Sequence, residues 1–180
     1  LGLLFDDWME AHLYNAYVVA ATLIIYGVLF IALENSSITA NPSITKVGHV
    51  STKTALFIGL FQLLSLVPGT SRSGSTILGA MVLGCSRGVA AEFSFFLGIP
   101  VMFGASFLKL VKFFVKGNVL TGPQIFYTIL GMAIAFGVSV YSIQFLMGYV
   151  RRHDFKFFGY YRIILGVVVL AYFGITALAA

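Results

Sequence analysis

The chain has 180 residues, of which 59% are hydrophobic and 9% are charged, and its mean hydropathy is +0.99. A soluble domain carries about 25% charged residues, so this composition excludes a soluble globular protein and indicates an integral membrane protein. The net charge of +5 comes largely from clustered Lys and Arg residues between apolar runs, which favours loops that flank membrane spans over a surface for nucleic acid.

The first part of the chain predicts one membrane span and a polar connection. Residues 1–12 are acidic and contain Trp8, which favours a segment at the membrane interface. Residues 13–33 are uncharged over 21 positions, enough to cross a hydrocarbon core of about 30 Å. Residues 34–53 are polar and lead to the next apolar run. Because residue 1 is Leu and no signal peptide precedes the span, we expect a fragment that lacks its true N-terminus.

The next apolar runs differ from full spans. The run over 54–67 is too short to cross a membrane comfortably, a Pro-Gly pair ends it, and a second short run follows at 77–84. Irregular backbone at membrane depth is tolerated where protein encloses it. We therefore predict a re-entrant helix–loop–helix hairpin over about 54–84, whose second half-helix begins near Gly74 or Ser75.

The rest of the chain predicts three further spans. Residues 89–108 form one, with a kink at Pro100. No charge interrupts residues 117–150, where a Gly-Pro pair suits a helix start, and residues 163–180 form the last span after a basic loop. The fold class is therefore an all-α polytopic membrane protein with about four full transmembrane helices and one re-entrant hairpin. The chain 1–180 is taken as a single integral membrane domain.

The basic residues indicate an orientation, because a re-entrant hairpin returns to the side that it left. One side of the membrane then collects six basic residues, and the other collects three together with the acidic N-terminal segment. The positive-inside rule places the larger group, and the mouth of the hairpin, in the cytoplasm. The two groups are Lys46, Lys53, Arg87, Arg151, Arg152 and Lys156 on one side and Lys109, Lys112 and Lys116 on the other.

The segment 68–76 is the most informative part of the chain and carries the single charge between positions 53 and 87. Its residues are Pro68, Gly69, Thr70, Ser71, Arg72, Ser73, Gly74, Ser75 and Thr76. A phosphate group needs a cation, exposed N–H groups and small side chains that allow close approach, and this segment supplies all three. Arg72 can hold two phosphate oxygens in a fork, and an Arg within an apolar membrane sequence indicates a functional site. A neighbouring hydroxyl could act as a nucleophile if a base lay within reach.

A structural alternative stays open, in which the small residues serve helix packing and Arg72 neutralises a carboxylate. Glu92 and His49 are the candidates for a base nearest in sequence. We expect Glu92 to be a structural partner of a cation rather than a catalytic group, and His49 to be solvated. The Phe-rich stretches 93–96 and 155–158 are expected to face lipid or the interface rather than to form a prenyl-binding groove.

With these residues, the chain resembles the undecaprenyl-diphosphate phosphatases, the bacitracin-resistance family of bacterial inner membranes. The segment 68–76 looks like the family's PG-x-SRSG-x-T signature, and the stretches 84–87 and 91–95 extend the resemblance, which covers essentially the whole chain. The resemblance implies an enzyme that removes the terminal phosphate of undecaprenyl diphosphate and regenerates the lipid carrier for peptidoglycan. It also implies a fold with an inverted repeat and two re-entrant hairpins. This chain would then be the C-terminal two-thirds of such an enzyme and would contain one of the two hairpins.

By that resemblance, the catalytic residues are Ser71, Arg72 and Thr76. The substrate-binding residues around the diphosphate are Gly69, Thr70, Ser73, Gly74 and Ser75. The family's earlier motif of paired acidic residues is absent here, so no metal ligand is expected in this chain. The expected cofactor, Mg²⁺ or Ca²⁺, would have its ligands in a missing N-terminal motif. One cysteine excludes an internal disulfide, and no Cys/His spacing resembles a zinc site.

The expected partners are a lipid diphosphate substrate and the bilayer, with no nucleic acid, and a homodimer stays open. The expected location is the bacterial inner (plasma) membrane. One rival function is a polyprenyl-lipid transporter or flippase, because broken helices near the midplane are also a transporter design. The other rival is an inactive fragment that lacks the acidic metal-binding motif.

Overall fold

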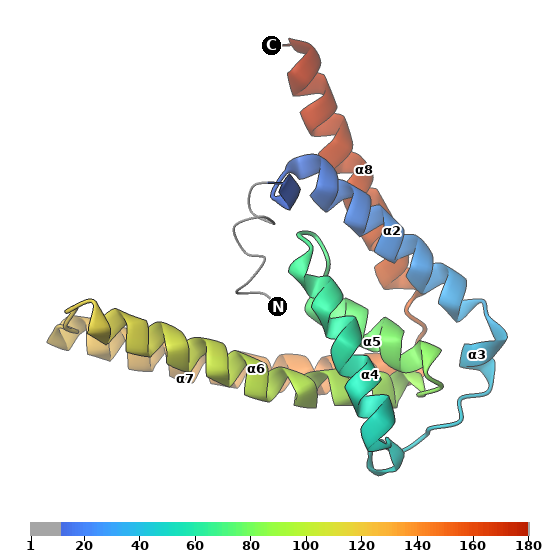
Figure 1. The fold of residues 1–180 in the computed structure, drawn as a ribbon, viewed down its shortest axis with the longest axis horizontal. Helices are drawn as coiled ribbons and strands as arrows, with labels where there is room; N and C mark the ends of the chain where they lie inside the picture. Colours follow the sequence, from blue (N-terminus) through green and yellow to red (C-terminus); the bar gives the residue numbers. More distant parts are fainter. Residues whose placement is uncertain (1–11, 180) are drawn as a thin grey trace.

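Figure 1 shows an all-helical chain, a computed structural model that describes residues 12–179. Its long helices are α2 (Ala16–Glu34), α6 (Arg87–Val115), α7 (Gly122–Arg152) and α8 (Lys156–Ala179). Each of these helices contains a stretch long and apolar enough to cross a membrane. The prediction of about four spanning helices is therefore confirmed for the described part of the chain. The predicted interfacial segment lies outside the described residues, except for its last residue, His12.

α2 and α8 pack along each other (Figure 1), although they come from opposite ends of the chain. Glycines make this contact close. A Cβ atom at Gly27 would lie 2.7 Å from the carbonyl oxygen of Gly159, and one at Gly166 would lie 2.9 Å from that of Ala20. Small residues at a helix crossing allow two backbones to approach within a membrane, which explains why α2 and α8 pack closely along one side of the molecule.

Short helices between these long ones form a helix–loop–helix unit. They are α4 (Thr52–Gln62), the 3-10 turn η2 (Leu63–Leu66) and α5 (Arg72–Val82). α4 and α5 lie side by side (Figure 1), and a Cβ atom at Gly79 would lie 2.7 Å from that of Phe61. The predicted hairpin region thus contains two short helices that pack against each other around a turn.

The polar connection after α2 contains α3 (Ser37–Ala40) and the 3-10 turn η1 (Val47–His49). Its loop is fixed to the α5–α6 connection: the Ile44 N–H donates to the Gly84 carbonyl at 3.0 Å, and the Ser86 N–H donates to the Ile44 carbonyl at 2.8 Å. His49 is exposed, as predicted.

The core lies where α2, the short helices, the start of α6 and the α7–α8 connection meet. Its largest members are Tyr26, Phe30, Leu33, Ile58, Leu78, Met81, Val89, Val150 and Phe155. Phe155 is buried, with its ring centroid 5.7 Å from that of Phe30. The prediction that this phenylalanine faces lipid or the interface is wrong, because the α7–α8 turn folds onto α2.

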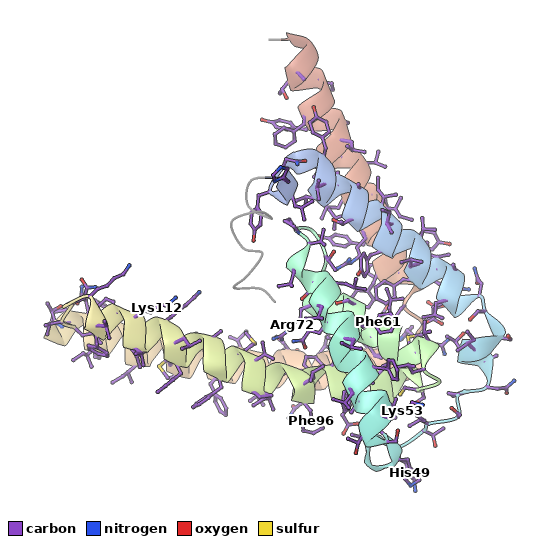
Figure 2. All side chains as sticks on the ribbon, in the orientation of Figure 1. His49, Lys53, Phe61, Arg72, Phe96 and Lys112 are labelled. Atoms are coloured by element: carbon purple, nitrogen blue, oxygen red, sulfur yellow. The ribbon has the colours of Figure 1, made fainter. Side chains whose placement is uncertain are left out.

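α6 and α7 run together as an arm away from this core (Figure 1). α7 begins at Gly122 with Pro123 in its first turn, as predicted, and Gln124 accepts a hydrogen bond from the Thr121 N–H at 2.9 Å. The most apolar stretch of α7 has no buried residues. Lys112 of α6 lies near the far end of the arm (Figure 2). Pro100 lies inside the continuous helix α6, and the kink there stays a prediction.

Candidate anion-binding site

The turn that joins η2 to α5 is anchored on α2. The Thr22 hydroxyl donates to the Pro68 carbonyl at 2.9 Å. Gly69 has a φ of +84°, a left-handed conformation that favours glycine, and a Cβ atom there would lie 2.7 Å from the Val19 carbonyl oxygen. The Thr70 N–H closes the turn by donating to the Val67 carbonyl at 3.1 Å. The Pro-Gly pair therefore fixes the tip of the hairpin against a long helix.

α5 begins at Arg72, because Ser71 caps its N-terminus. The backbone of Ser71 is extended, and its hydroxyl accepts a hydrogen bond from the Gly74 N–H at 3.1 Å. The predicted start near Gly74 or Ser75 is therefore two or three residues late. Ser73 follows with its hydroxyl 3.1 Å from that of Ser71. The first N–H groups of a helix and its dipole favour a negative charge, so two hydroxyls and a helix N-terminus lie together here.

Arg72 extends toward α6 at the point where that helix has a glycine. A Cβ atom at Gly98 would lie 2.7 Å from Nη2 of Arg72, so the absence of a side chain makes room for the guanidinium. The ion pairs among the described side chains join Arg87 to Glu34 and Lys156 to Asp154. Neither Arg72 nor Glu92 takes part in them. The structure therefore supports neither the alternative in which Arg72 neutralises a carboxylate nor the expectation that Glu92 is the structural partner of a cation.

Arg72 lines a groove of about 360 Å³ that we call the Arg72 groove. Its lining residues include Arg72, Glu92, Phe95, Phe96, Met102 and Met147. Arg72 and Phe96 are both labelled in Figure 2, near the point where α5 meets α6. Apart from the two charged residues, the wall of this groove is made by apolar side chains and Gly98.

Ser75 and Thr76 point into the protein. Ser75 is 0% exposed and Thr76 is 1% exposed. The Ser75 hydroxyl donates to the carbonyls of Ser71 at 3.2 Å and Arg72 at 3.0 Å. The Thr76 hydroxyl lies 2.6 Å from that of Ser94 on α6 and also bonds to the Arg72 carbonyl at 3.1 Å. The structure thus places these two hydroxyls behind the start of α5, where they hold its backbone in position.

On the other side of α5, a cavity of about 170 Å³ is lined by Ser71, Ser73, Gly74, Ser94 and Arg162, together with apolar residues. We call it the hairpin cavity. Arg162 belongs to α8, and its Nη2 lies 3.4 Å from the position of a Cβ atom at Gly74. Its Nη1 is buried and has no hydrogen-bond partner among the described residues. A second cation therefore faces the hydroxyls at the N-terminus of α5.

Sequence reasoning missed Arg162 because the last span was predicted to begin at residue 163. That start is wrong: α8 begins at Lys156, so Arg162 lies within an apolar helix that could cross a membrane. The sequence contained a signal for this residue, since an Arg inside such a helix indicates a functional site. Tyr160 and Tyr161 suggested instead that the membrane span starts after them, because aromatic residues also mark the end of a span.

A second buried charge lies at the far end of α2. The Glu34 side chain is 0% exposed, forms an ion pair with Arg87, and accepts a hydrogen bond from the Phe155 N–H at 2.9 Å. This carboxylate joins α2 to the start of α6 and to the α7–α8 turn. Its role was also not predicted, because its two partners, Arg87 and Phe155, are distant from it in the sequence.

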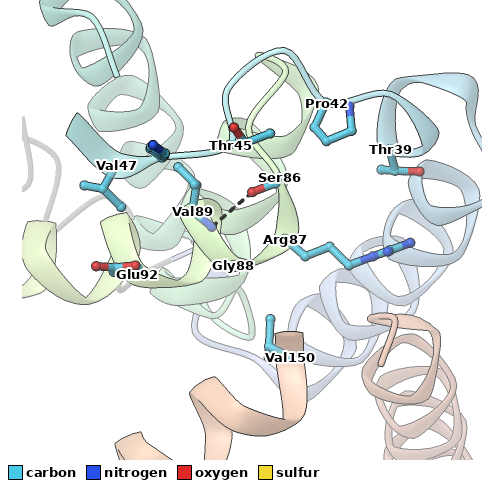
Figure 3. A pocket seen from close by; sticks show the side chains of 11 residues that line it. Thr39, Pro42, Thr45, Val47, Ser86, Arg87, Gly88, Val89, Glu92 and Val150 are labelled. Atoms are coloured by element: carbon cyan, nitrogen blue, oxygen red, sulfur yellow. Dashed lines mark hydrogen bonds between the residues drawn. The ribbon is translucent and has the colours of Figure 1, made fainter. Parts of the chain in front are cut away.

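A larger cavity of about 530 Å³ lies beside this ion pair and contains none of the residues 68–76. Figure 3 shows that Arg87 and Glu92 line different parts of its wall, near the polar loop that holds Pro42 and Thr45. Glu92 lines both this cavity and the Arg72 groove. The polar cavity and the signature are therefore neighbours across α6.

The described residues do not fit a divalent metal site. No group of three or more His, Cys, Asp or Glu side chains lies close enough together in residues 12–179 to hold a metal ion. Mg²⁺ and Ca²⁺ are held by several oxygen ligands, usually including carboxylates. Residues 12–179 therefore supply no set of ligands for such a cation.

The fold and the site define a multi-pass membrane protein with an arginine-containing and serine-rich hairpin between its long helices. The family model of the bacitracin resistance protein BacA matches residues 1–168. The chain belongs to this family, as the resemblance in its sequence indicated.

Three bacterial relatives of this chain carry the name undecaprenyl-diphosphatase. The protein from Streptococcus mutans serotype c is 56% identical over 172 residues, which cover 96% of this chain and 61% of the relative. The protein from Lactobacillus delbrueckii subsp. bulgaricus is 57% identical over 169 residues, which cover 94% of this chain and 62% of the relative. The protein from Acetivibrio thermocellus is 55% identical over 173 residues, which cover 96% of this chain and 62% of the relative. The chain thus spans about three-fifths of the length of these curated relatives.

Proposed function

We propose that this chain forms the substrate-binding hairpin of an undecaprenyl-diphosphatase. The enzyme hydrolyses undecaprenyl diphosphate to undecaprenyl phosphate and inorganic phosphate, so that the lipid carrier returns to cell-wall synthesis. The observation that carries the proposal is that Arg162 of α8 lies beside Gly74, at the capped N-terminus of α5 whose first residue is Arg72, so that two arginines from different helices belong to this site. The names of the bacterial relatives support the choice of substrate.

Each residue of the signature has a role in this proposal. Arg72 binds oxygens of the diphosphate, and the hydroxyls of Ser71 and Ser73 donate to them beside the first N–H groups of α5. Gly69 and Thr70 form the turn, and Gly74 leaves space for Arg162. Thr76 was predicted to be catalytic and Ser75 to bind the substrate, and both roles stay predictions. Their burial and their bonds to the backbone of α5 support positioning roles, which we propose instead.

The unit of α4 and α5 is, in this proposal, a re-entrant hairpin and one half of an inverted repeat. Its helices are 11 residues long each, too short to cross a hydrocarbon core of about 30 Å at 1.5 Å per residue. The location that we propose is the bacterial inner (plasma) membrane. The divalent cation and a homodimer stay predictions, and the relatives' greater length leaves room for cation ligands outside this chain.

Phosphate release from undecaprenyl diphosphate by the purified full-length protein in detergent tests the proposal. We expect release by the wild-type protein and a loss of at least about a hundredfold in Arg72→Ala. Lys112→Ala is the matched control, because it removes a cation near the far end of the arm (Figure 2). Tight binding of the lipid with no release by any variant would support the transporter and contradict the phosphatase.

A further inference from the structure

Arg162 has no anionic partner among the described residues. It lies within α8, one of the helices that are apolar enough to cross a membrane. The ion pairs of the described residues do not include it, and its buried Nη1 has no hydrogen-bond partner there. A charge inside a membrane helix is costly and usually has a partner. The side chains that hold this guanidinium toward the hairpin cavity therefore determine how well the cavity is prepared for an anion.

The aromatic ring of Tyr26 on α2 lies against this guanidinium. Cζ of Arg162 is 5.9 Å from the centroid of the ring. The face of an aromatic ring is electrostatically negative, and it attracts a guanidinium within about 6 Å of its centroid. Tyr26 is 8% exposed, so water competes little for this contact. The ring thus offers the cation a neutral partner and leaves its charge available to an anion.

The hydroxyl of Tyr26 connects the same residue to the turn before α5. It is hydrogen-bonded to the side chain of Thr70 in that turn. The turn is also held to α2 by Thr22, whose hydroxyl donates to the Pro68 carbonyl at 2.9 Å. Tyr26 therefore contacts both the turn of the hairpin and the arginine that faces the hairpin cavity.

The close crossing of α2 and α8 places Tyr26 and Arg162 at the same level. Their neighbours in the chain meet there, since a Cβ atom at Gly27 would lie 3.2 Å from the nitrogen of Ile163. Arg162 in turn reaches α5, where its Nη2 is 3.4 Å from the position of a Cβ atom at Gly74. A side chain that is already held in its binding position loses less freedom when a ligand arrives.

We propose that Tyr26 is a positioning residue, whose ring holds the guanidinium of Arg162 beside the start of α5 for the diphosphate of the substrate. This inference deepens the proposed function and rests on it in one respect, that Arg162 contacts the diphosphate. A tyrosine that only fills the core would act through its volume. A positioning tyrosine acts through the charge distribution of its ring, and only while Arg162 is present.

The dissociation constant of inorganic pyrophosphate for the full-length protein in detergent tests the role of the ring. We expect Tyr26→Leu to weaken binding at least tenfold, and Tyr26→Phe, which keeps the ring, to stay within about threefold of the wild type. Phe61→Leu is the matched control, because Phe61 packs on Gly79 of α5. An unchanged affinity in Tyr26→Leu, or equal losses in Tyr26→Leu and Phe61→Leu, would overturn the inference.

The same measurement in an Arg162→Ala background separates this inference from the proposed function. We expect Arg162→Ala alone to weaken pyrophosphate binding at least tenfold, and the further change Tyr26→Leu to alter the remaining affinity less than twofold. An unchanged affinity in Arg162→Ala would contradict the proposed site and the inference together. A loss in Arg162→Ala to which Tyr26→Leu adds its full effect would contradict the positioning role alone.

Pentafluorophenylalanine at position 26 tests the ring with little change in side-chain shape. Fluorination removes the negative potential of the ring face, which is the part that attracts a cation. We expect pyrophosphate binding at least fivefold weaker than in Tyr26→Phe, at a similar melting temperature. Equal affinities of these two variants would show that the ring only fills space, and would overturn the inference.

Discussion

Arg72 owes its position to Gly98, which has no side chain where the guanidinium lies. Gly98→Ala would place a methyl group 2.7 Å from the present position of Nη2 and displace the end of a flexible side chain. We expect phosphate release to fall at least about tenfold, equivalent to about 1.4 kcal/mol, while the melting temperature stays the same or rises, because Ala is the better helix former. Gly104→Ala on the same helix is the control, since no atom lies within 4 Å of its added Cβ. Equal activities of the two variants would contradict this role.

The hydroxyls of Thr76 and Ser94 join α5 to α6 through a buried contact of 2.6 Å. Thr76→Val leaves the Ser94 hydroxyl without this partner, and Ser94→Ala removes the same bond from the other side. We expect each change to cost about 1–3 kcal/mol of unfolding free energy, and the double variant to cost less than their sum. Reversible unfolding in mixed detergent measures the cycle. Additive costs would show that the pair contributes no coupling.

At the scale of the elements, Glu34 joins α2 to the start of α6 and to the α7–α8 turn, which are far apart in the sequence. Arg87→Ala leaves the buried carboxylate of Glu34 without its ion pair. Breaking a buried ion pair in this way costs about 3–5 kcal/mol of unfolding free energy. Arg87 is partly exposed, so we expect a loss toward the lower end of that range. Thermal unfolding should show a clearly lower melting temperature.

Lys156→Ala provides the comparison for the ion pair of Glu34. Its partner Asp154 is 3.9 Å away and both side chains are partly exposed, so this pair contributes about 0–1 kcal/mol. The melting temperature should therefore change little. A larger loss from Lys156→Ala than from Arg87→Ala would refute the assignment of Glu34 as the main tie between the helices.

Local sequence was sufficient to predict the spans and the signature, because each depends on residues that are neighbours in the chain. An uncharged run of sufficient length predicted α2, and a Pro-Gly pair between short apolar runs predicted the turn before α5. The burial of Phe155 and the approach of Arg162 to Gly74 depend instead on how α8 packs against α2. One sequence does not reveal that packing, since the glycines that permit it, such as Gly159, occur equally in exposed helices.

At the scale of the whole molecule, the basic residues predict which side of the membrane each loop occupies. Lys46→Cys and Val119→Cys place a thiol in the polar loop and in the α6–α7 turn, where both residues are exposed. We expect an impermeant maleimide to label Val119→Cys in intact cells and Lys46→Cys after permeabilisation. Labelling of both from the same side would contradict the orientation.

The native Cys85 should not disturb this measurement. It is 3% exposed, and burial raises the pKa of its thiol, so less of the reactive thiolate is present at neutral pH than for an exposed cysteine. The wild-type protein should therefore remain unlabelled and serve as the background.

We propose that the start of α5 binds a diphosphate through Arg72. The most direct test is the dissociation constant of a non-hydrolysable prenyl methylenediphosphonate for the full-length protein, measured by calorimetry in detergent. We predict at least a tenfold weaker affinity for Arg72→Ala and an unchanged affinity for Lys112→Ala. Equal affinities of the wild-type protein and Arg72→Ala would contradict the claim.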